Sequence, residues 1–155
     1  MTAVFVPYTF RHQPTWEALR DSGWEWYPVE LAAGDDTSYL HFFEYRWRVG
    51  SDFIVCEHDV IPTVEQLQQL EDCPAEWCSF NEYDAGPPTL SLARFRSSFI
   101  AGHRDLWRQL WAANRKTVFQ PLWCKLDSWL TDCCGQPCLH QSPHVVNSRP
   151  LGVTH

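Results

Sequence analysis

The stretch that decides the fold is FIVCEHDVIP, residues 53–62, in which an apolar run ends in three polar side chains. Consecutive apolar residues followed at once by charge are typical of a strand buried on both faces of a parallel sheet. In open α/β sheets, ligands bind beyond the carboxyl ends of such strands. The stretch therefore predicts a buried strand that brings Glu57, His58 and Asp59 to a site.

This acidic turn has two interpretations. It can be an ordinary solvated turn whose Asp caps neighbouring backbone groups. At the end of a buried strand, however, Asp59 can present its carboxylate to a divalent cation that also binds phosphate oxygens. The position directly after the apolar run favours the second interpretation.

Strand and helix patterns alternate around this stretch. Thr63 followed by Gln66 has the form of a capping box and predicts a helix start. Helices of about ten residues between strands imply right-handed crossovers and a parallel sheet. The predicted strands lie at residues 2–7, 24–29, 53–56 and 77–80, and the predicted helices at 14–21, 37–50 and 64–70. We expect one compact α/β domain over residues 1–147, with a mainly parallel central sheet flanked by helices, and a C-terminal tail at 148–155.

Two further helices are expected in the second half of the chain. One spans residues 97–114 with a break at Gly102, and the other spans residues 121–134. Asp127 lies in the middle of the second helix, where Asp is locally unfavourable. Either a partner holds Asp127 there, or it is an ordinary exposed residue.

Charge is unevenly distributed along the chain. The formal net charge of −7 argues against indiscriminate binding to nucleic acid. Half of the twelve basic residues nevertheless fall within one short window: Arg94, Arg96, Arg104, Arg108, Arg115 and Lys116. This window is either a local surface for phosphates or a solvated helix face.

Location and thiol chemistry follow from the same composition. No apolar run approaches the roughly 20 residues that span a bilayer, and no basic residues precede the apolar start of the chain. We expect a cytoplasmic protein, without membrane contact, whose seven cysteines are mostly reduced. A zinc site could be drawn from Cys73, Cys78, Cys133, Cys134, Cys138, His140 and His144, but the spacings differ from the usual Cys-x2-Cys knuckles, so buried free thiols are favoured.

Several short motifs, spread over nearly the whole chain, occur together. They are Val6-Pro7-Tyr8, Glu57-His58-Asp59-Val60, Cys73-Pro74 with Trp77-Cys78, Leu92-x-x-Phe95, Trp123-x-x-Leu126-Asp127, and the closing His140 and His144. Together they resemble small glycosyltransferase-like proteins of phages and bacteria, including those that hypermodify DNA bases. These proteins are similar to a reduced GT-A glycosyltransferase.

The resemblance implies a metal-dependent site. In GT-A enzymes an acidic motif at the end of a central strand binds Mn or Mg, which grips the diphosphate of a nucleotide sugar. Glu57 and Asp59 match that motif, and the longer Glu57 leaves the ligand set open. A His from the C-terminal part, His144 or His140, completes the metal shell in this comparison, although the comparable segment favours a further His where this chain has Asn147.

The resemblance also implies the remaining roles. A UDP-sugar is the favoured donor, and the carboxylates expected to act in catalysis are Asp127 and Glu57. Asp127 would be the general base if the anomeric centre inverts. Tyr8 can stack on the nucleobase or pack within its own domain. The residues expected to contact the donor are Pro7, Tyr8, Glu57, His58, Asp59 and Arg94.

A phage-like setting and the basic window suggest an acceptor. They point to a hydroxymethylated pyrimidine in DNA, flipped out of the stack in a host cytoplasm, and to Arg96, Arg104 and Arg108 as its contacts. A protein or small-molecule acceptor is the alternative.

Two other classes of protein also fit the sequence. One is a non-catalytic nucleotide- or DNA-binding module with a degenerate GT-A-like fold, which the shortness of the chain favours. The other is an interaction domain held together by zinc through its Cys- and His-rich C-terminal part.

Overall fold

The computed structural model describes residues 1–34, 37–80, 89–114, 126–140 and 146–147. Its first half follows the predicted alternation of strands and helices. The elements are β1 (Val4–Tyr8), α1 (Gln13–Ser22), β2 (Trp26–Glu30), α2 (Ser38–Val49), β3 (Phe53–Cys56), β4 (Val60–Ile61), α3 (Val64–Asp72) and β5 (Trp77–Phe80).

The second half agrees less closely with the prediction. The expected helix at 97–114 is indeed interrupted after Gly102, but the strand at residues 92–95 was not predicted. The structure describes the last helix from Leu126, and residues 121–125, where the predicted helix begins, lie outside the described residues. The elements are β6 (Leu92–Phe95), α4 (Ser97–Gly102), α5 (Leu106–Asn114), α6 (Leu126–Cys134), β7 (Cys138–His140) and β8 (Val146–Asn147). None of the described helices is long and apolar enough to cross a membrane.

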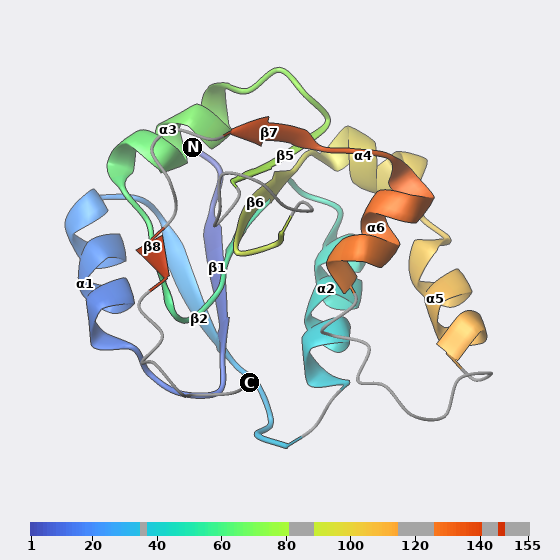
Figure 1. The fold of residues 1–155 in the computed structure, drawn as a ribbon, viewed down its shortest axis with the longest axis horizontal. Coiled ribbons are helices and arrows are strands. Elements are labelled where there is room, and N and C mark those ends of the chain that lie inside the picture. The colour runs from blue at the N-terminus through green and yellow to red at the C-terminus, as the bar shows by residue number, and fades with distance from the viewer. Residues whose placement is uncertain (35–36, 81–88, 115–125, 141–145, 148–155) are drawn as a thin grey trace.

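The main sheet has six strands in the order β2-β1-β3-β6-β5-β7 (Figure 1). β1 is parallel to β2 and β3, and β5 is parallel to β7, whereas β6 runs antiparallel to both of its neighbours. The predicted mainly parallel sheet is therefore confirmed, with one reversed strand near its middle. Because of this order, the carboxyl ends of β1, β3, β5 and β7 all lie at one edge.

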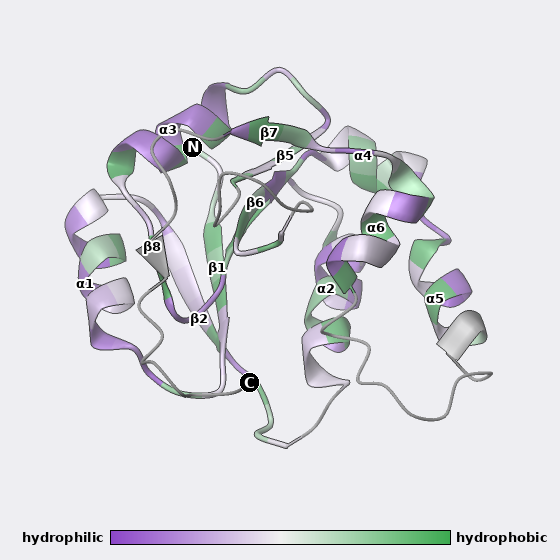
Figure 2. Cartoon of the chain, viewed as in Figure 1, coloured by the Kyte–Doolittle hydropathy of each residue, from purple (hydrophilic) through white to green (hydrophobic). Residues whose placement is uncertain are grey.

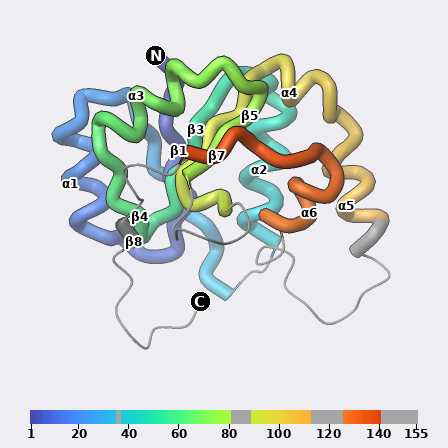
Figure 3. Tube along the Cα trace, turned by 45° about the horizontal axis from the view of Figure 1, so that its top comes forward, coloured from blue at the N-terminus to red at the C-terminus, as the bar shows by residue number. Residues whose placement is uncertain are grey.

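Helices cover both faces of the sheet, so the domain has three layers (Figures 1 and 3). Apolar residues of α2, α4, α5 and α6 form one core with Phe53 and Val55, and those of α1 and α3 form the other with Ile54 and Cys56. Successive side chains of β3 thus enter opposite cores, as the period of a strand requires. Figure 2 shows β1 largely hydrophobic, whereas the helices on either side of the sheet carry both hydrophobic and hydrophilic residues. This double burial explains the unbroken apolar run at 53–56.

Hydrogen bonds hold the segment that follows the acidic turn, between Val60 and the start of α3. The predicted capping box of α3 is confirmed, because Thr63 Oγ1 accepts from Gln66 N (3.1 Å) and Gln66 Oε1 accepts from Thr63 N (2.9 Å). Thr15 of α1 donates through Oγ1 to the Val60 carbonyl at 2.7 Å. These contacts fix the direction in which the chain leaves Asp59.

A second, small sheet brings the C-terminal segment back to the same place. β4 pairs antiparallel with β8, with Val60 opposite Asn147 and Ile61 opposite Val146. The pairing sets residues 146–147 alongside the segment that follows the acidic turn.

Candidate active site

The acidic turn lies at the carboxyl end of β3, as predicted. Glu57 N donates to the Ser91 carbonyl (2.9 Å) and Val60 N donates to the Glu57 carbonyl (3.1 Å), which closes a tight turn. Asp59 is only 1% exposed, whereas Glu57 and His58 are half-buried. A carboxylate this deeply buried is held by polar partners or by a cation. The solvated-turn interpretation therefore does not fit Asp59.

Tyr39, in the first turn of α2, faces this turn. Its hydroxyl is buried and makes no well-formed hydrogen bond within the part of the chain that the structure describes. The pKa of Tyr39 is raised well above its ordinary value, first by burial and then by the negative charges of Glu57, Asp127 and Asp59. The hydroxyl consequently stays protonated and remains a hydrogen-bond donor at neutral pH.

Three predicted carboxylates lie within electrostatic range of the Tyr39 hydroxyl. Glu57 and Asp59 come from the end of β3, and Asp127 comes from the first turn of α6. All three act on the Tyr39 hydroxyl. The charge of Asp127 therefore reaches the same hydroxyl as the charges of the acidic turn. Nothing in the sequence distinguished Tyr39, because its place depends on how α2 packs on the sheet.

The loop after β1 adjoins the acidic turn. Thr9 N donates to His58 Nδ1 at 3.2 Å, and the Phe10 ring lies 4.2 Å from the His58 ring between centroids. Phe10 is 42% exposed. Tyr8 is buried and packs edge-on against Trp16 of α1, with 5.2 Å between the ring centroids. Tyr8 therefore packs within its own domain, and Phe10 is the exposed ring at this edge.

The sequence analysis named Pro7 as a donor contact but did not identify Phe10. Pro7 is buried within β1, opposite Val29 of β2, so its side chain packs inside the domain near the end of the strand. Phe10 was missed, although an aromatic residue three positions beyond the end of the predicted strand is a signal that could have found it.

Arg94 and Arg96 do not lie on an exposed basic surface. Arg94 is 1% exposed, and its Nη2 donates to the carbonyls of Cys73 (3.1 Å) and Ala75 (2.7 Å). Arg96 is half-buried and donates to the same two carbonyls, at 2.6 Å and 3.1 Å. Both guanidinium groups hold the connection between α3 and β5. This placement corrects the prediction that Arg94 contacts the donor and Arg96 the acceptor.

The other two arginines predicted to bind the acceptor are exposed. Arg104 lies between α4 and α5, and Arg108 lies on α5. Arg108 Nη2 pairs with Asp105 Oδ1 at 2.7 Å. The basic window therefore offers a smaller exposed positive surface than its sequence implied. Arg115 and Lys116 lie outside the described residues.

His140 lies with cysteines and not with Asp59. It ends β7, which the sheet order separates from β3 by β6 and β5, or about 14 Å at the usual strand spacing. Its ring nitrogens lie instead near the thiols of Cys73 and Cys78. The prediction that His140 completes the metal shell of Asp59 does not fit this placement. The alternative, His144, lies outside the described residues.

The arrangement as a whole is an α/β domain with two carboxylate side chains, Glu57 and Asp59, just beyond the end of the central strand β3. No known family and no curated protein matches the sequence. Among solved structures, the fold is similar to that of a glycosyltransferase involved in the glycosylation of the major capsid of PBCV-1. That match has a TM-score of 0.54 and 12% identity, and covers 90% of this chain and 81% of that one.

A second solved structure has a similar fold. It is A197 from STIV, with a TM-score of 0.56 and 7% identity, and the match covers 94% of this chain and 83% of that one. At such identities the likeness concerns the fold. It supports the glycosyltransferase-like architecture expected from the sequence motifs.

Proposed function

We propose that this protein is a divalent-cation-dependent glycosyltransferase, which moves a sugar from a nucleotide-diphosphate donor to a hydroxyl acceptor. One observation carries the proposal: the acidic turn Glu57-His58-Asp59 lies at the carboxyl end of the buried central strand β3, and its Asp59 is only 1% exposed. The fold similarity to a glycosyltransferase that acts in capsid glycosylation supports the same reaction class.

The residues at the turn suit a hard cation such as Mn or Mg. Carboxylate oxygens are the ligands these ions prefer, and Asp59 and Glu57 offer them at the end of a rigid, buried strand. A cation bound there supplies positive charge that offsets the charge of the departing diphosphate. Asp59, the deeper of the two carboxylates, is the ligand we propose first.

The donor's nucleotide would lie against the loop that follows β1. His58 and the exposed Phe10 stand side by side there. An exposed aromatic ring offers a stacking surface to any base, worth about 1–3 kcal/mol. We propose Phe10, and not the buried Tyr8, as the stacking residue for a UDP-sugar.

Proton transfer would fall to Asp127. In an inverting transfer, a carboxylate must accept the proton of the acceptor hydroxyl as the new bond forms. Asp127 is half-buried and lies near the acidic turn without being part of it. The protonated Tyr39 hydroxyl can donate to a neighbouring carboxylate and so orient it. This arrangement separates the residues that hold the donor from the residue that takes the proton.

A screen of nucleotide sugars tests the proposal. With Mn present, we expect slow hydrolysis of one donor, a UDP-sugar, and none after chelation of the metal. The product is the free nucleoside diphosphate, measured by chromatography. If nucleotides bind but no donor in the panel is hydrolysed, the protein is a binding module with a glycosyltransferase-like fold.

The acceptor we propose is a hydroxyl on hydroxymethylated DNA, contacted by Arg104 and Arg108. Two exposed arginines neutralise few phosphates, so the log–log dependence of affinity on salt should be no steeper than about −1.8, at about −0.9 per phosphate. Replacing both with Ala should flatten this dependence and leave donor hydrolysis unchanged. Arg20→Ala, an exposed arginine on α1, is the control. Failure to bind this DNA at low salt, with salt-independent transfer to a small hydroxyl compound, would exclude DNA as the acceptor.

A further inference from the structure

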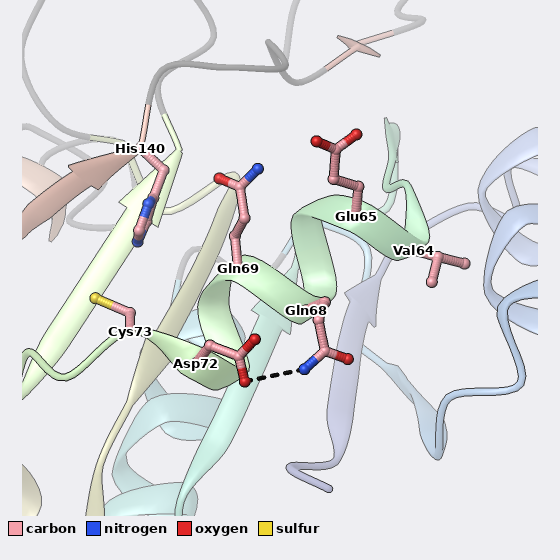
Figure 4. Close-up of a pocket in the computed structure, with 7 residues that line it drawn as sticks. All are labelled: Val64, Glu65, Gln68, Gln69, Asp72, Cys73 and His140. Carbon is pink, nitrogen blue, oxygen red and sulfur yellow. Dashed lines mark hydrogen bonds between the residues drawn. The ribbon is translucent and has the colours of Figure 1, made fainter.

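Three metal-competent side chains meet away from the acidic turn. Cys73 caps the end of α3, Cys78 lies in β5 and His140 ends β7. Their sulphur and ring-nitrogen atoms all lie within 4.8 Å of one another. Figure 4 shows the Cys73 sulphur and the His140 ring facing each other across a pocket beside α3. Zinc–ligand bonds of about 2.0–2.3 Å bring tetrahedral ligands to separations only slightly shorter than this.

The sheet register adds a fourth side chain. Cys78 is paired in register with Cys138 of the parallel strand β7, so both side chains point to the face covered by α3. His140 follows Cys138 by two residues and shares that face. Cys138 is exposed, and its thiol is not among the three ligand atoms that lie within 4.8 Å of one another, so it would join them through a change of its side-chain rotamer.

The charge around this cluster favours an anionic group. Arg94 is buried on the same face, opposite Cys78 in register, and its Nη2 lies 3.4 Å from Cys78 Sγ. Arg94 forms no ion pair with a carboxylate among the residues described. A guanidinium cannot lose its proton and is costly to bury without a negative partner. Thiolates bound to a metal would provide that partner.

The imidazole is also ready to bind a metal. His140 Nε2 is buried and has no hydrogen-bond partner in the described part of the chain. Burial raises the pKa of the Cys78 thiol to about 12, so a metal would have to displace its proton.

We propose that Cys73, Cys78, Cys138 and His140 bind one zinc ion in a closed, structural site. Three thiolates and an imidazole are soft ligands that select zinc over Mn or Mg. Such a site carries one net negative charge, which the Arg94 guanidinium balances. The pocket between α3 and His140, about 660 Å³ in volume, gives the ion a path from solvent.

The ion would tie three separate elements together. β7 is a three-residue edge strand whose only partner in the main sheet is β5. Through zinc, β7 would also be joined to the end of α3. The chain then continues from β7 towards β8, which pairs with β4 beside the acidic turn. This site is separate from the proposed Mn or Mg site and does not depend on the proposed function.

Elemental analysis and native mass spectrometry of the purified chain test the proposal. We expect about one zinc per chain in the wild type, and a loss of at least tenfold in zinc content in Cys78→Ser and His140→Ala. Cys133→Ser is the matched control, because this cysteine is exposed on α6, and it should keep its zinc. A wild type that neither contains zinc nor takes it up from solution would overturn the proposal.

Because a variant can lose zinc simply by failing to fold, a metal titration of the wild type provides a second test. After removal of zinc, cobalt(II) should bind with the absorption of cobalt–thiolate charge transfer, and zinc should then displace it. Asp59→Asn should show the same absorption, since its carboxylate belongs to the other site. A cobalt complex without thiolate absorption would overturn the proposal, and so would a disulfide among Cys73, Cys78 and Cys138 in freshly purified protein.

Discussion

Replacing Asp59 with Asn should abolish the metal-dependent binding of UDP and the hydrolysis of the donor sugar. The change keeps the shape of the side chain and removes its negative charge at a position that is only 1% exposed. We expect donor affinity in the presence of Mn to fall by more than about 100-fold, because even outer-shell partners of a metal are worth 10–100-fold. Calorimetry with UDP and Mn measures this loss.

The control for Asp59→Asn is Asp52→Asn, the same substitution just before the other end of β3. Asp52 is exposed, and its Oδ1 accepts from Ser97 N, which an Asn oxygen can also do. This variant should bind UDP and Mn as the wild type does. If Asp59→Asn does not fold, Glu57→Gln takes its place. Wild-type binding by a folded Asp59→Asn would refute the metal site.

Replacing Phe95 with Ala should lower the free energy of unfolding by about 3–5 kcal/mol, the usual cost of removing a buried aromatic ring. Phe95 is fully buried in β6 and stacks on Phe53 and Trp77, with ring centroids 5.1 Å and 5.6 Å away. These contacts join three strands of the sheet to the core under α2 and α4. Such a loss is a large part of the 5–15 kcal/mol that stabilises a typical domain.

Urea unfolding followed by tryptophan fluorescence measures the Phe95→Ala effect. Tyr45→Ala is the control, since that ring is 55% exposed on α2, and its loss should change stability by no more than about 0.5 kcal/mol. A change below about 1 kcal/mol for Phe95→Ala would mean that this aromatic cluster does not hold the sheet together.

The sequence predicted β3 and its site because the signals there are local. A run of apolar residues, an abrupt change to charge, and a capping box, all between Phe53 and Gln66, define the strand, the turn and the next helix. None of these depends on a distant part of the chain. The fold class followed from the same alternation of strands and helices.

β6 was missed because one of its buried residues is an arginine. As part of a basic window in the sequence, Arg94 indicated an exposed positive surface. In the structure its guanidinium donates to backbone carbonyls about 20 residues earlier in the chain. Burial of such a group is a tertiary effect that a single sequence does not reveal.

The misplacement of His140 has a similar cause. The sequence places His140 and His144 in the C-terminal part of the chain but does not give the order of the strands, so it could not show which residues His140 would meet. In the structure, β7 joins the far edge of the sheet beside β5, where Cys73 and Cys78 already lie. Tyr39 was missed because only the packing of α2 brings it to the acidic turn.

The pairing of β4 with β8 has a consequence for the order of folding. It joins Val60 to Asn147 through a ladder of only two residues on each side, across most of the length of the chain. Closing so long a loop costs entropy that so short a ladder does little to offset. We therefore expect this ladder to form last and to open first, so that the turn carrying Glu57 and Asp59 is completed only after the rest of the domain has folded.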